Sequence, residues 1–260
     1  MFSRWLALAI SFLSFPLNYL SNYIGSAPGI KDVTNKYASL FTPAGYAFSI
    51  WGLIYLSWFI YSIFSVLPAE RKKPVYDKLS PLLAVSGIMG MAWQFIFRFG
   101  YIGLSLIWIF FMLVIALILF NRVQNFVKNG GSRWVSTPFN MYAGWLSVAS
   151  IANASIWLIS VGLRGHNEAG YANAMITIAV SLGLYIASGY RDFVYPAVIA
   201  WALAAIAVAR KYDSEAVFLY ACAGSAVVLV GSLTSIVLGR REKLNNKIGS
   251  QNTSGTFTNR

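Results

Sequence analysis

The sequence predicts an all-α fold, a polytopic helix bundle that crosses a membrane. Two features of composition point to this class, since 58% of the 260 residues are apolar and only 11% are charged. A soluble domain carries about 25% charged residues. The third feature is that the apolar residues gather into runs close to the roughly 20 residues that a spanning helix needs. Such runs are expected to be helical, because lipid offers the backbone no hydrogen-bonding water.

Eight apolar runs are candidates for membrane spans. Their approximate bounds are 5–24, 44–67, 80–98, 101–121, 137–161, 171–189, 193–209 and 216–238. The first run is interpreted as a retained helix, because no small-residue cleavage site follows it promptly. A very short turn, "RFGY", joins the third run to the fourth, and the seventh run is the shortest.

The distribution of basic residues predicts the orientation of these spans. With eight spans, 14 Lys and Arg residues lie on the side of the N-terminus and 6 on the other side. Cytoplasmic loops carry the excess of Lys and Arg. We therefore expect a multi-pass protein of the plasma (inner) membrane with both termini in the cytoplasm. A seven-span alternative would place the basic C-terminal tail outside, which the same rule disfavours.

Composition also limits the function. The net charge of +12 sits in loops and in the tail, which indicates contact with lipid head groups and no nucleic acid as a partner. One cysteine, Cys222, and one histidine allow no thiolate metal cluster, and we expect no cofactor. All eight acidic residues are predicted to lie in loops or the tail. This disfavours ion coupling through a membrane carboxylate, whereas passive transport of a small solute stays open.

The second run opens with "FTPAGYAFSIWGLIYLSW", in which Thr42 is a candidate helix cap and Pro43 suits the first helical position. Aromatic residues then recur at helical spacing on one face. They are Phe48, Trp51, Tyr55 and Trp58. This stripe is compatible with core packing, with the wall of a ligand pocket or with a lipid-facing belt.

Two further runs carry aromatic and amide side chains. The third run contains Trp93 and Gln94, and an amide in hydrocarbon is expected to face protein, water or ligand. The fifth run places five residues within an arc of roughly 120° on a helix. They are Tyr142, Trp145, Ala149, Asn153 and Trp157. This face is either a packing seam or a pocket wall, and a pocket would suit a large, flat, mostly apolar ligand.

With these residues in view, the chain resembles the translocator-protein family, also called tryptophan-rich sensory proteins or peripheral benzodiazepine receptors. In that family the second helix opens with Trp-x-Pro-Pro followed by a Trp, which Pro43 and Trp51 match in part. The fifth helix carries a Tyr-x-x-Trp motif with a later Asn and Trp. Tyr142, Trp145, Asn153 and Trp157 reproduce this spacing. The resemblance covers about residues 1–165.

The sequence departs from the family pattern at several positions. Phe41 and Ala44 replace the first Trp and the second Pro of the family's second helix. Met91 stands where the family has an Asn, for which Gln94 is a candidate substitute, and Arg98 replaces one Phe of a short Phe-Phe-Gly turn. Members typically end after five helices, whereas this chain continues.

The resemblance implies three segments: a five-helix translocator-protein-like core at 1–165, about three additional transmembrane helices at 166–239, and a polar cytoplasmic tail at 240–260. It also implies an intrahelical pocket for a porphyrin, a sterol-like molecule or another lipophile. Candidate ligand-binding residues are Phe48, Trp51, Tyr55, Trp93, Gln94, Tyr142, Trp145, Ala149, Asn153 and Trp157.

Several functions stay open at this point. The resemblance implies a sensor or carrier of a lipophilic ligand, and light-dependent degradation of porphyrin is an activity seen in some members. A small-solute transporter is the alternative. No pair of a nucleophile and an adjacent base can be recognised in the sequence, so no catalytic residue is assigned. The last three spans, rich in Ala, Gly and Ser, either pack on the core or form an oligomer interface such as a homodimer.

Overall fold

The computed structural model describes residues 1–20, 28–163 and 167–255, with the side chains of Tyr19 and of residues 240–255 left undescribed. Within these ranges the chain forms helices and no strand, as the sequence predicts. The α-helices are α1 (Phe2–Leu20), α2 (Ile30–Lys36), α3 (Ile50–Val66), α4 (Pro74–Arg98), α5 (Ile102–Lys128), α6 (Thr137–Ser160), α7 (Glu168–Tyr190), α8 (Val194–Arg210) and α9 (Glu215–Gly255). Short 3-10 helices are η1 (Gly45–Ser49), η2 (Pro68–Glu70) and η3 (Arg133–Ser136).

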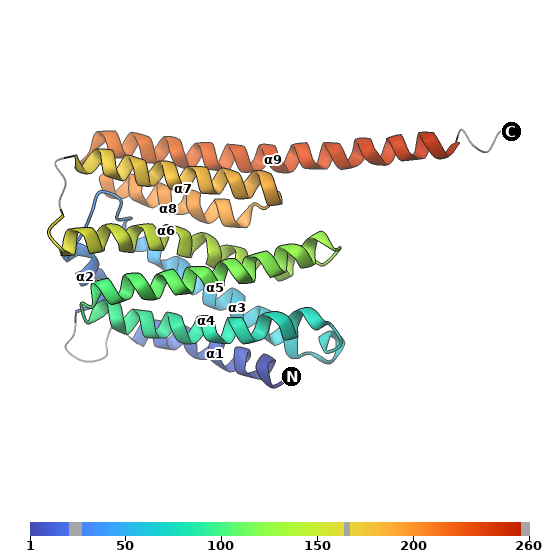
Figure 1. Cartoon of the computed structure of the whole chain (residues 1–260), viewed down its shortest axis with the longest axis horizontal. Helices are drawn as coiled ribbons and strands as arrows, with labels where there is room; N and C mark the ends of the chain where they lie inside the picture. Colours follow the sequence, from blue (N-terminus) through green and yellow to red (C-terminus); the bar gives the residue numbers. More distant parts are fainter. Residues whose placement is uncertain (21–27, 164–166, 256–260) are drawn as a thin grey trace.

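Five long helices close into a ring. Helix α1 packs against α3 and α4, α4 packs against α5, α5 against α6, and α6 returns to α3. Helix α8 lies on the outer side of α6, and α7 and α9 pack on α8 and on each other (Figure 1). The molecule is therefore a five-helix ring with a three-helix layer along one side, and α6 belongs to the ring while supporting that layer.

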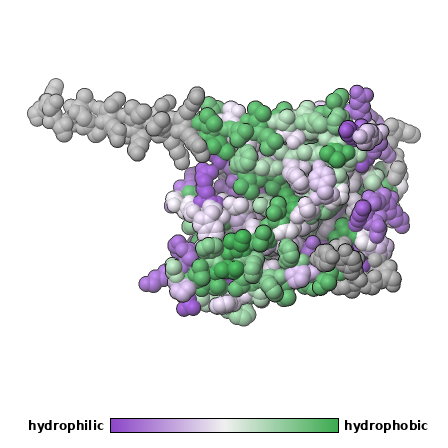
Figure 2. Space-filling model, turned by 180° about the vertical axis from the view of Figure 1, so that it is seen from behind, coloured by the Kyte–Doolittle hydropathy of each residue, from purple (hydrophilic) through white to green (hydrophobic). Residues whose placement is uncertain are grey.

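Among the described residues, six helices are long and apolar enough to cross a membrane by length and composition. They are Gly45–Val66, Pro74–Arg98, Ile102–Lys128, Arg133–Ser160, Glu168–Tyr190 and Glu215–Gly239. The first and seventh predicted spans correspond to α1, which lies outside this set, and to α8, which is apolar but shorter. Hydrophobic side chains cover most of one face between hydrophilic patches at its two ends (Figure 2). The protein is an integral, multi-pass membrane protein.

The helices alternate in direction. The N-terminal end of α1 lies at the same end of the bundle as the α3–α4, α5–α6 and α7–α8 connections, and α9 runs out beyond that end (Figure 1). This end of the bundle, counted with the adjoining helix ends, carries nine of the 15 basic residues that precede residue 240: Arg4, Arg71, Lys72, Lys73, Lys78, Arg122, Lys128, Arg133 and Arg191. The fold thus brings basic segments from different parts of the chain together at one end of the bundle.

Two predicted helix ends differ in the structure. The second span begins as η1 at Gly45 and becomes α-helical at Ile50, so the expectation that Pro43 opens the α-helix is wrong. The reason is a tertiary contact, because the backbone N–H of Ala44 donates to the carbonyl oxygen of Ala205 in α8 at 3.0 Å. At the other end, α9 continues to Gly255, well into the segment predicted as a polar tail.

A buried guanidinium holds the start of α1 in place. The side chain of Arg4 is fully buried and donates to both carboxylate oxygens of Asp77, at 2.8 and 2.7 Å. It also donates to the carbonyl oxygens of Ser65 at 2.8 Å and Lys73 at 3.0 Å. Because charge-assisted bonds of this kind are the stronger ones, Arg4 fastens α1 to the α3–α4 connection. The sequence predicted a loop at Asp77, whereas the structure places this residue in the first turn of α4.

Helices α6 and α8 approach closely at Gly144. A Cβ atom on Gly144 would lie 2.8 Å from the carbonyl oxygen of Tyr195. Next to this point the hydroxyl groups of Ser147 and Tyr195 are 2.6 Å apart. The two helices can touch because Gly144 has no side chain. Beside this contact, the hydroxyl groups of Ser147 and Tyr195 satisfy each other by a hydrogen bond.

A second polar contact between α6 and its neighbours lies one turn before Gly144, at the start of α6. Asn140 donates to the Asp192 carboxylate at 2.6 Å and accepts from Gln124 of α5 at 3.0 Å, while Asp192 also accepts from the backbone N–H of Tyr195 at 2.8 Å. Burial raises the pKa of the Asp192 carboxyl above its ordinary value. The sequence placed Asp192 in a loop, yet the fold buries it where the α7–α8 connection meets α5 and α6.

The α6–α8 contact predicts the outcome of a glycine substitution. Gly144→Ala is expected to lower stability by about 1–3 kcal/mol, because the added methyl group meets backbone atoms that cannot move independently. Gly52→Ala is the matched control, since a Cβ there meets no atom within 4 Å. Thermal unfolding in detergent measures both. Equal midpoints for the two variants would contradict the close approach.

Candidate functional site

A cavity of about 540 Å³ opens among α1, α2, η1, α3 and α4, and we call it the ring cavity. This size lies within the range of about 300–1,000 Å³ that is usual for small-molecule sites. Its lining residues are Asn18, Ile30, Lys31, Thr34, Asn35, Pro43, Gly45, Tyr46, Phe48, Trp51, Trp93 and Gln94. Three of the ring helices thus supply the walls, and the short helix α2 lies along one side.

Four of the predicted ligand-binding residues line the ring cavity: Phe48, Trp51, Trp93 and Gln94. The ring of Trp51 stacks on Tyr55 at 5.5 Å between centroids, and Trp93 stacks on Phe97 at 5.1 Å. Both indoles are held by these neighbours, so their orientation is set before a ligand arrives.

Three more predicted residues form a layer directly behind this wall. Tyr55, Tyr142 and Trp145 are buried and absent from the cavity lining. Trp145 meets Trp51 edge-on at 6.3 Å and Phe48 edge-on at 5.7 Å. Tyr142 packs at 4.7 Å from Trp58, the remaining member of the aromatic stripe on α3. These residues support the wall from α3 and α6.

The last three predicted residues lie elsewhere. Ala149, Asn153 and Trp157 continue along α6 and do not line the ring cavity. The side-chain oxygen of Asn153 accepts from Ser105 of α5 at 3.2 Å, and the Trp157 indole lies close to Gly103 of α5. The α6 face that the sequence presents as one stripe is therefore divided, with its first part behind the cavity and its last part on α5.

Several buried polar atoms around the site have no hydrogen-bond partner within the part of the chain that the structure describes. Trp93 Nε1 and Thr34 Oγ1 belong to residues that line the ring cavity, and Trp145 Nε1 and Asn153 Nδ2 lie in the surrounding core. An unpaired buried polar group costs free energy, and such groups are rare in native structures. The atoms Trp93 Nε1 and Thr34 Oγ1 are enclosed by protein and do not face the open space of the cavity. Gln94 differs, because its side chain interacts with the Tyr55 hydroxyl.

Helix α2 supplies a wall that sequence reasoning missed. Lys31, Thr34 and Asn35 line the ring cavity from this helix, and Lys31 is exposed. A polar seven-residue helix produces no apolar run, so a search for membrane spans passes over it. The available signal was Asp32, whose carboxylate accepts from the backbone N–H of Gly29 at 2.9 Å and marks the start of the helix.

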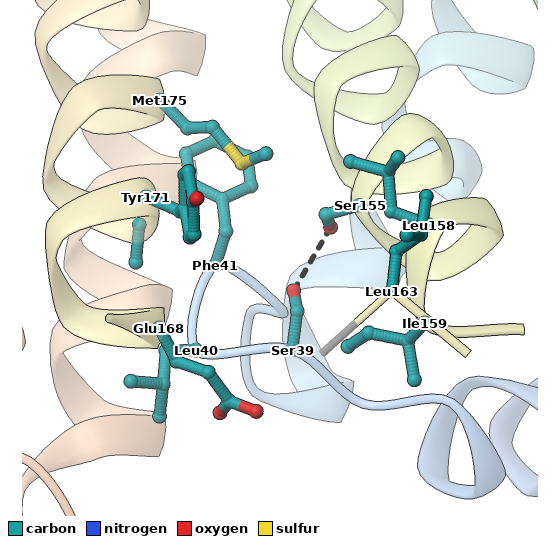
Figure 3. Close-up of a pocket in the computed structure, with 11 residues that line it drawn as sticks. Ser39, Leu40, Phe41, Ser155, Leu158, Ile159, Leu163, Glu168, Tyr171 and Met175 are labelled. Carbon is teal, nitrogen blue, oxygen red and sulfur yellow. Dashed lines mark hydrogen bonds between the residues drawn. The ribbon is translucent and has the colours of Figure 1, made fainter. Parts of the chain in front are cut away.

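A second cavity, of about 330 Å³, lies where the end of α6 and the start of α7 diverge (Figure 3). It shares no residue with the ring cavity, and none of the predicted ligand-binding residues lines it. Its lining residues are Ser39, Leu40, Phe41, Ser155, Leu158, Ile159, Leu163, Glu168, Tyr171, Ala172 and Met175. We call it the α6–α7 pocket.

A third cavity, of about 410 Å³, occupies the opposite end of the bundle and includes Glu70, Lys73 and Tyr76. Here the polar groups pair with each other, since Glu70 accepts from Lys73 at 2.6 Å and from Tyr76 at 2.8 Å. These hydrogen bonds hold the pKa of the Glu70 carboxyl below its usual value. The third cavity therefore offers fewer unsatisfied groups to a ligand than the ring cavity does.

The fold and the ring cavity define a multi-pass membrane protein with a ligand-sized space at one end of a helical ring, between α1, α2, α3 and α4. The sequence profile of the TSPO-like protein family matches residues 4–234, and the chain belongs to this family. The match extends past residue 165, where the recognised motifs end, and includes α7, α8 and part of α9. No match was found among curated proteins or among solved structures.

The layered arrangement predicts how Trp145 contributes. Trp145→Phe is expected to lower stability by about 1–3 kcal/mol, because the indole is fully buried and its loss leaves unfilled space. Trp5→Phe is the matched control, since Trp5 is 53% exposed on α1. Thermal unfolding without ligand compares the two. If Trp145→Phe were as stable as the control, Trp145 would not be part of the packed layer.

Proposed function

We propose that the protein binds a large lipophilic aromatic ligand, of the tetrapyrrole or sterol-like class, in the ring cavity and acts as a sensor or carrier. The observation that carries this proposal is the cavity of about 540 Å³, which is walled by the indoles of Trp51 and Trp93 and by Gln94. Membership of the TSPO-like family supports a lipophilic ligand.

The chemistry of the lining supports a ligand with a flat apolar body and a few polar groups. Indole and phenyl faces stack on planar rings, which favours an aromatic or fused-ring molecule. The exposed ammonium of Lys31 at the lining adds a preference for an acidic group on the part nearest α2.

Passive transport of a small solute is the second candidate. Four buried hydroxyl groups of the ring helices, those of Tyr61, Ser80, Ser86 and Tyr142, have no hydrogen-bond partner among the described residues. Polar side chains inside a bundle mark solute pathways in many membrane proteins. A pathway along these hydroxyls would carry a polar solute, whereas the ring cavity alone would retain a lipophile.

We further propose that the end of the bundle carrying both the α1 start and the α9 extension faces the cytoplasm of a plasma (inner) membrane. The argument is the clustering of basic connections at this end. A homodimer is compatible with this orientation.

Reporter fusions test the orientation. In a bacterial host, a fluorescent protein fused after Arg260 is expected to fluoresce, and alkaline phosphatase fused there is expected to be inactive. The reverse is expected for a fusion at Tyr212, which is 91% exposed in the α8–α9 connection. Active phosphatase after Arg260 would overturn the proposed orientation.

A titration with protoporphyrin, followed by tryptophan fluorescence, tests the ligand. Saturable quenching is expected for the unsubstituted protein, because Trp51 and Trp93 line the cavity. Gly45→Leu is expected to raise the protoporphyrin concentration at half-saturation at least about tenfold. The reason is that a Cβ at Gly45 meets open space, so the leucine side chain would fill part of the cavity. Gly52→Leu is the matched control, because Gly52 also has open space but lies outside the lining.

The outcomes separate the candidate functions. Linear quenching that is equal in both variants would mean partitioning into detergent and would remove the tetrapyrrole proposal. Flux of a polar solute into liposomes that Tyr142→Phe reduces would favour the transporter. An absorption spectrum of the porphyrin that changes under light only with protein present would indicate degradation.

A further inference from the structure

One wall of the ring cavity is the short 3-10 helix η1 together with the residue pair that precedes it. Pro43, Gly45, Tyr46 and Phe48 line the cavity from this segment. Helix η1 is only five residues long, and 3-10 helices have poorer hydrogen-bond geometry than α-helices. Its N-cap residue is Ala44, whose methyl side chain accepts no hydrogen bond. The position of this wall is therefore expected to depend on contacts with neighbouring helices.

Helix α8 makes three contacts with this wall from outside the cavity. The backbone N–H of Ala44 donates to the carbonyl oxygen of Ala205 at 3.0 Å. The indole N–H of Trp201 donates to the carbonyl oxygen of Ala47 at 3.4 Å, and the Trp201 ring meets Tyr46 edge-on at 5.3 Å between centroids. Neither Trp201 nor Ala205 lines the ring cavity. Helix α8 thus contacts the wall without contacting the space that a ligand would fill.

Tyr46 belongs both to the cavity and to the contact with α8. Its side chain lines the ring cavity, and its ring packs against Trp201. The wall is therefore one side chain thick at this point. Further along η1, Phe48 lines the same cavity and packs edge-on against Trp145 of α6 at 5.7 Å. Two helices outside the cavity hold η1, α8 through Tyr46 and α6 through Phe48.

The support of η1 is uneven around its axis. A Cβ atom at Gly45 would meet no atom within 4 Å, so there is open space beside η1 where it lines the cavity. On the protein side Ala47 is fully buried. Close packing holds a segment only where partner atoms are present. Loss of the α8 contacts would therefore leave η1 free to move toward the open space and change the shape of the cavity.

We propose that α8 sets the affinity of the ring cavity by fixing η1, with Trp201 as the positioning residue. This inference rests on the proposed function of the ring cavity. It gives the three-helix layer a role in ligand binding, because α8 belongs to that layer and keeps the Tyr46 wall in place. Coupling between two sites is reciprocal. A ligand that packs against Tyr46 therefore also stabilises the contact with Trp201, and occupancy of the cavity is passed to α8.

Titration with protoporphyrin, followed by tryptophan fluorescence, tests the role of Trp201. Trp201→Ala is expected to raise the protoporphyrin concentration at half-saturation at least about tenfold. Trp134→Ala is the matched control, because both indoles are 40% exposed and Trp134 also packs against an aromatic ring, that of Phe64. Each variant removes one of the nine tryptophans. Equal half-saturation in the two variants would overturn the proposal.

A conservative variant and a double variant separate positioning from a general loss of stability. Trp201→Phe keeps an aromatic edge against Tyr46, so its half-saturation is expected to stay within about threefold of the unsubstituted protein. In a Tyr46→Ala background, Trp201→Ala is expected to change half-saturation by less than about threefold, because the contact is already lost. A tenfold change that persists in this background would contradict the proposal. If Trp201→Ala fails to fold, Trp201→Leu takes its place in the same comparisons.

Cysteine labelling measures the support of η1 without a ligand. In a Cys222→Ser background, which removes the exposed native thiol, Ala47→Cys places a thiol at a fully buried position of η1. Trp201→Ala is expected to raise its rate of modification by iodoacetamide at least about tenfold, since local opening exposes the thiol. Trp134→Ala is expected to leave the rate unchanged. With Trp201 in place, saturating protoporphyrin is expected to lower the rate.

The two measurements distinguish failure of this inference from failure of the ring-cavity proposal. Equal labelling rates in Trp201→Ala and Trp134→Ala would overturn the role of α8, even where protoporphyrin binds. Absence of saturable quenching in the unsubstituted protein would overturn the ring-cavity proposal instead. The labelling rates would still decide whether α8 holds η1.

Discussion

The contact between α6 and α8 at Gly144 is the constraint on which the arrangement of the ring cavity and the α6–α7 pocket depends. Helix α6 closes the five-helix ring on one side and carries the three-helix layer on the other. Without a side chain at Gly144 the backbone of Tyr195 fits against α6, and the Ser147–Tyr195 hydroxyl pair holds it there. Since α6 backs the ring cavity through Trp145 and lines the α6–α7 pocket through Leu158, a shift of this helix would change both.

Buried polar groups in this protein fall into two kinds. Arg4 and Asp192 are buried, yet each is surrounded by hydrogen-bond partners and joins elements that are distant in the sequence. Trp93 Nε1 and Thr34 Oγ1 are buried without partners at the ring cavity. The first kind stabilises the fold, because a charge taken out of water must be paired. The second kind costs free energy, because protein encloses both atoms and offers them no hydrogen bond.

The aromatic residues show how far sequence patterns reach into the site. Phe48, Trp51, Tyr55 and Trp58 do follow one another as predicted, but only the first two line the cavity, while Tyr55 and Trp58 pack beneath them. On α6, Trp145 stands behind the cavity and Asn153 bonds to α5. Spacing establishes that residues share a face of a helix. It does not establish which neighbour each part of that face meets, because long helices cross several neighbours along their length.

The sequence by itself determined the fold class, the approximate helices and the family motifs, since hydropathy and helical periodicity are local consequences of placing a hydrogen-bonded backbone in lipid. It also indicated Trp51, Trp93 and Gln94, which the structure places in the lining of one cavity. Only the tertiary structure decided that α2 lies along that cavity, that Asp192 is buried, and that Phe41, Ala172 and Met175 meet beside Glu168. These features depend on which helices become neighbours and how each is rotated, and such long-range packing has no signature within a single run of residues.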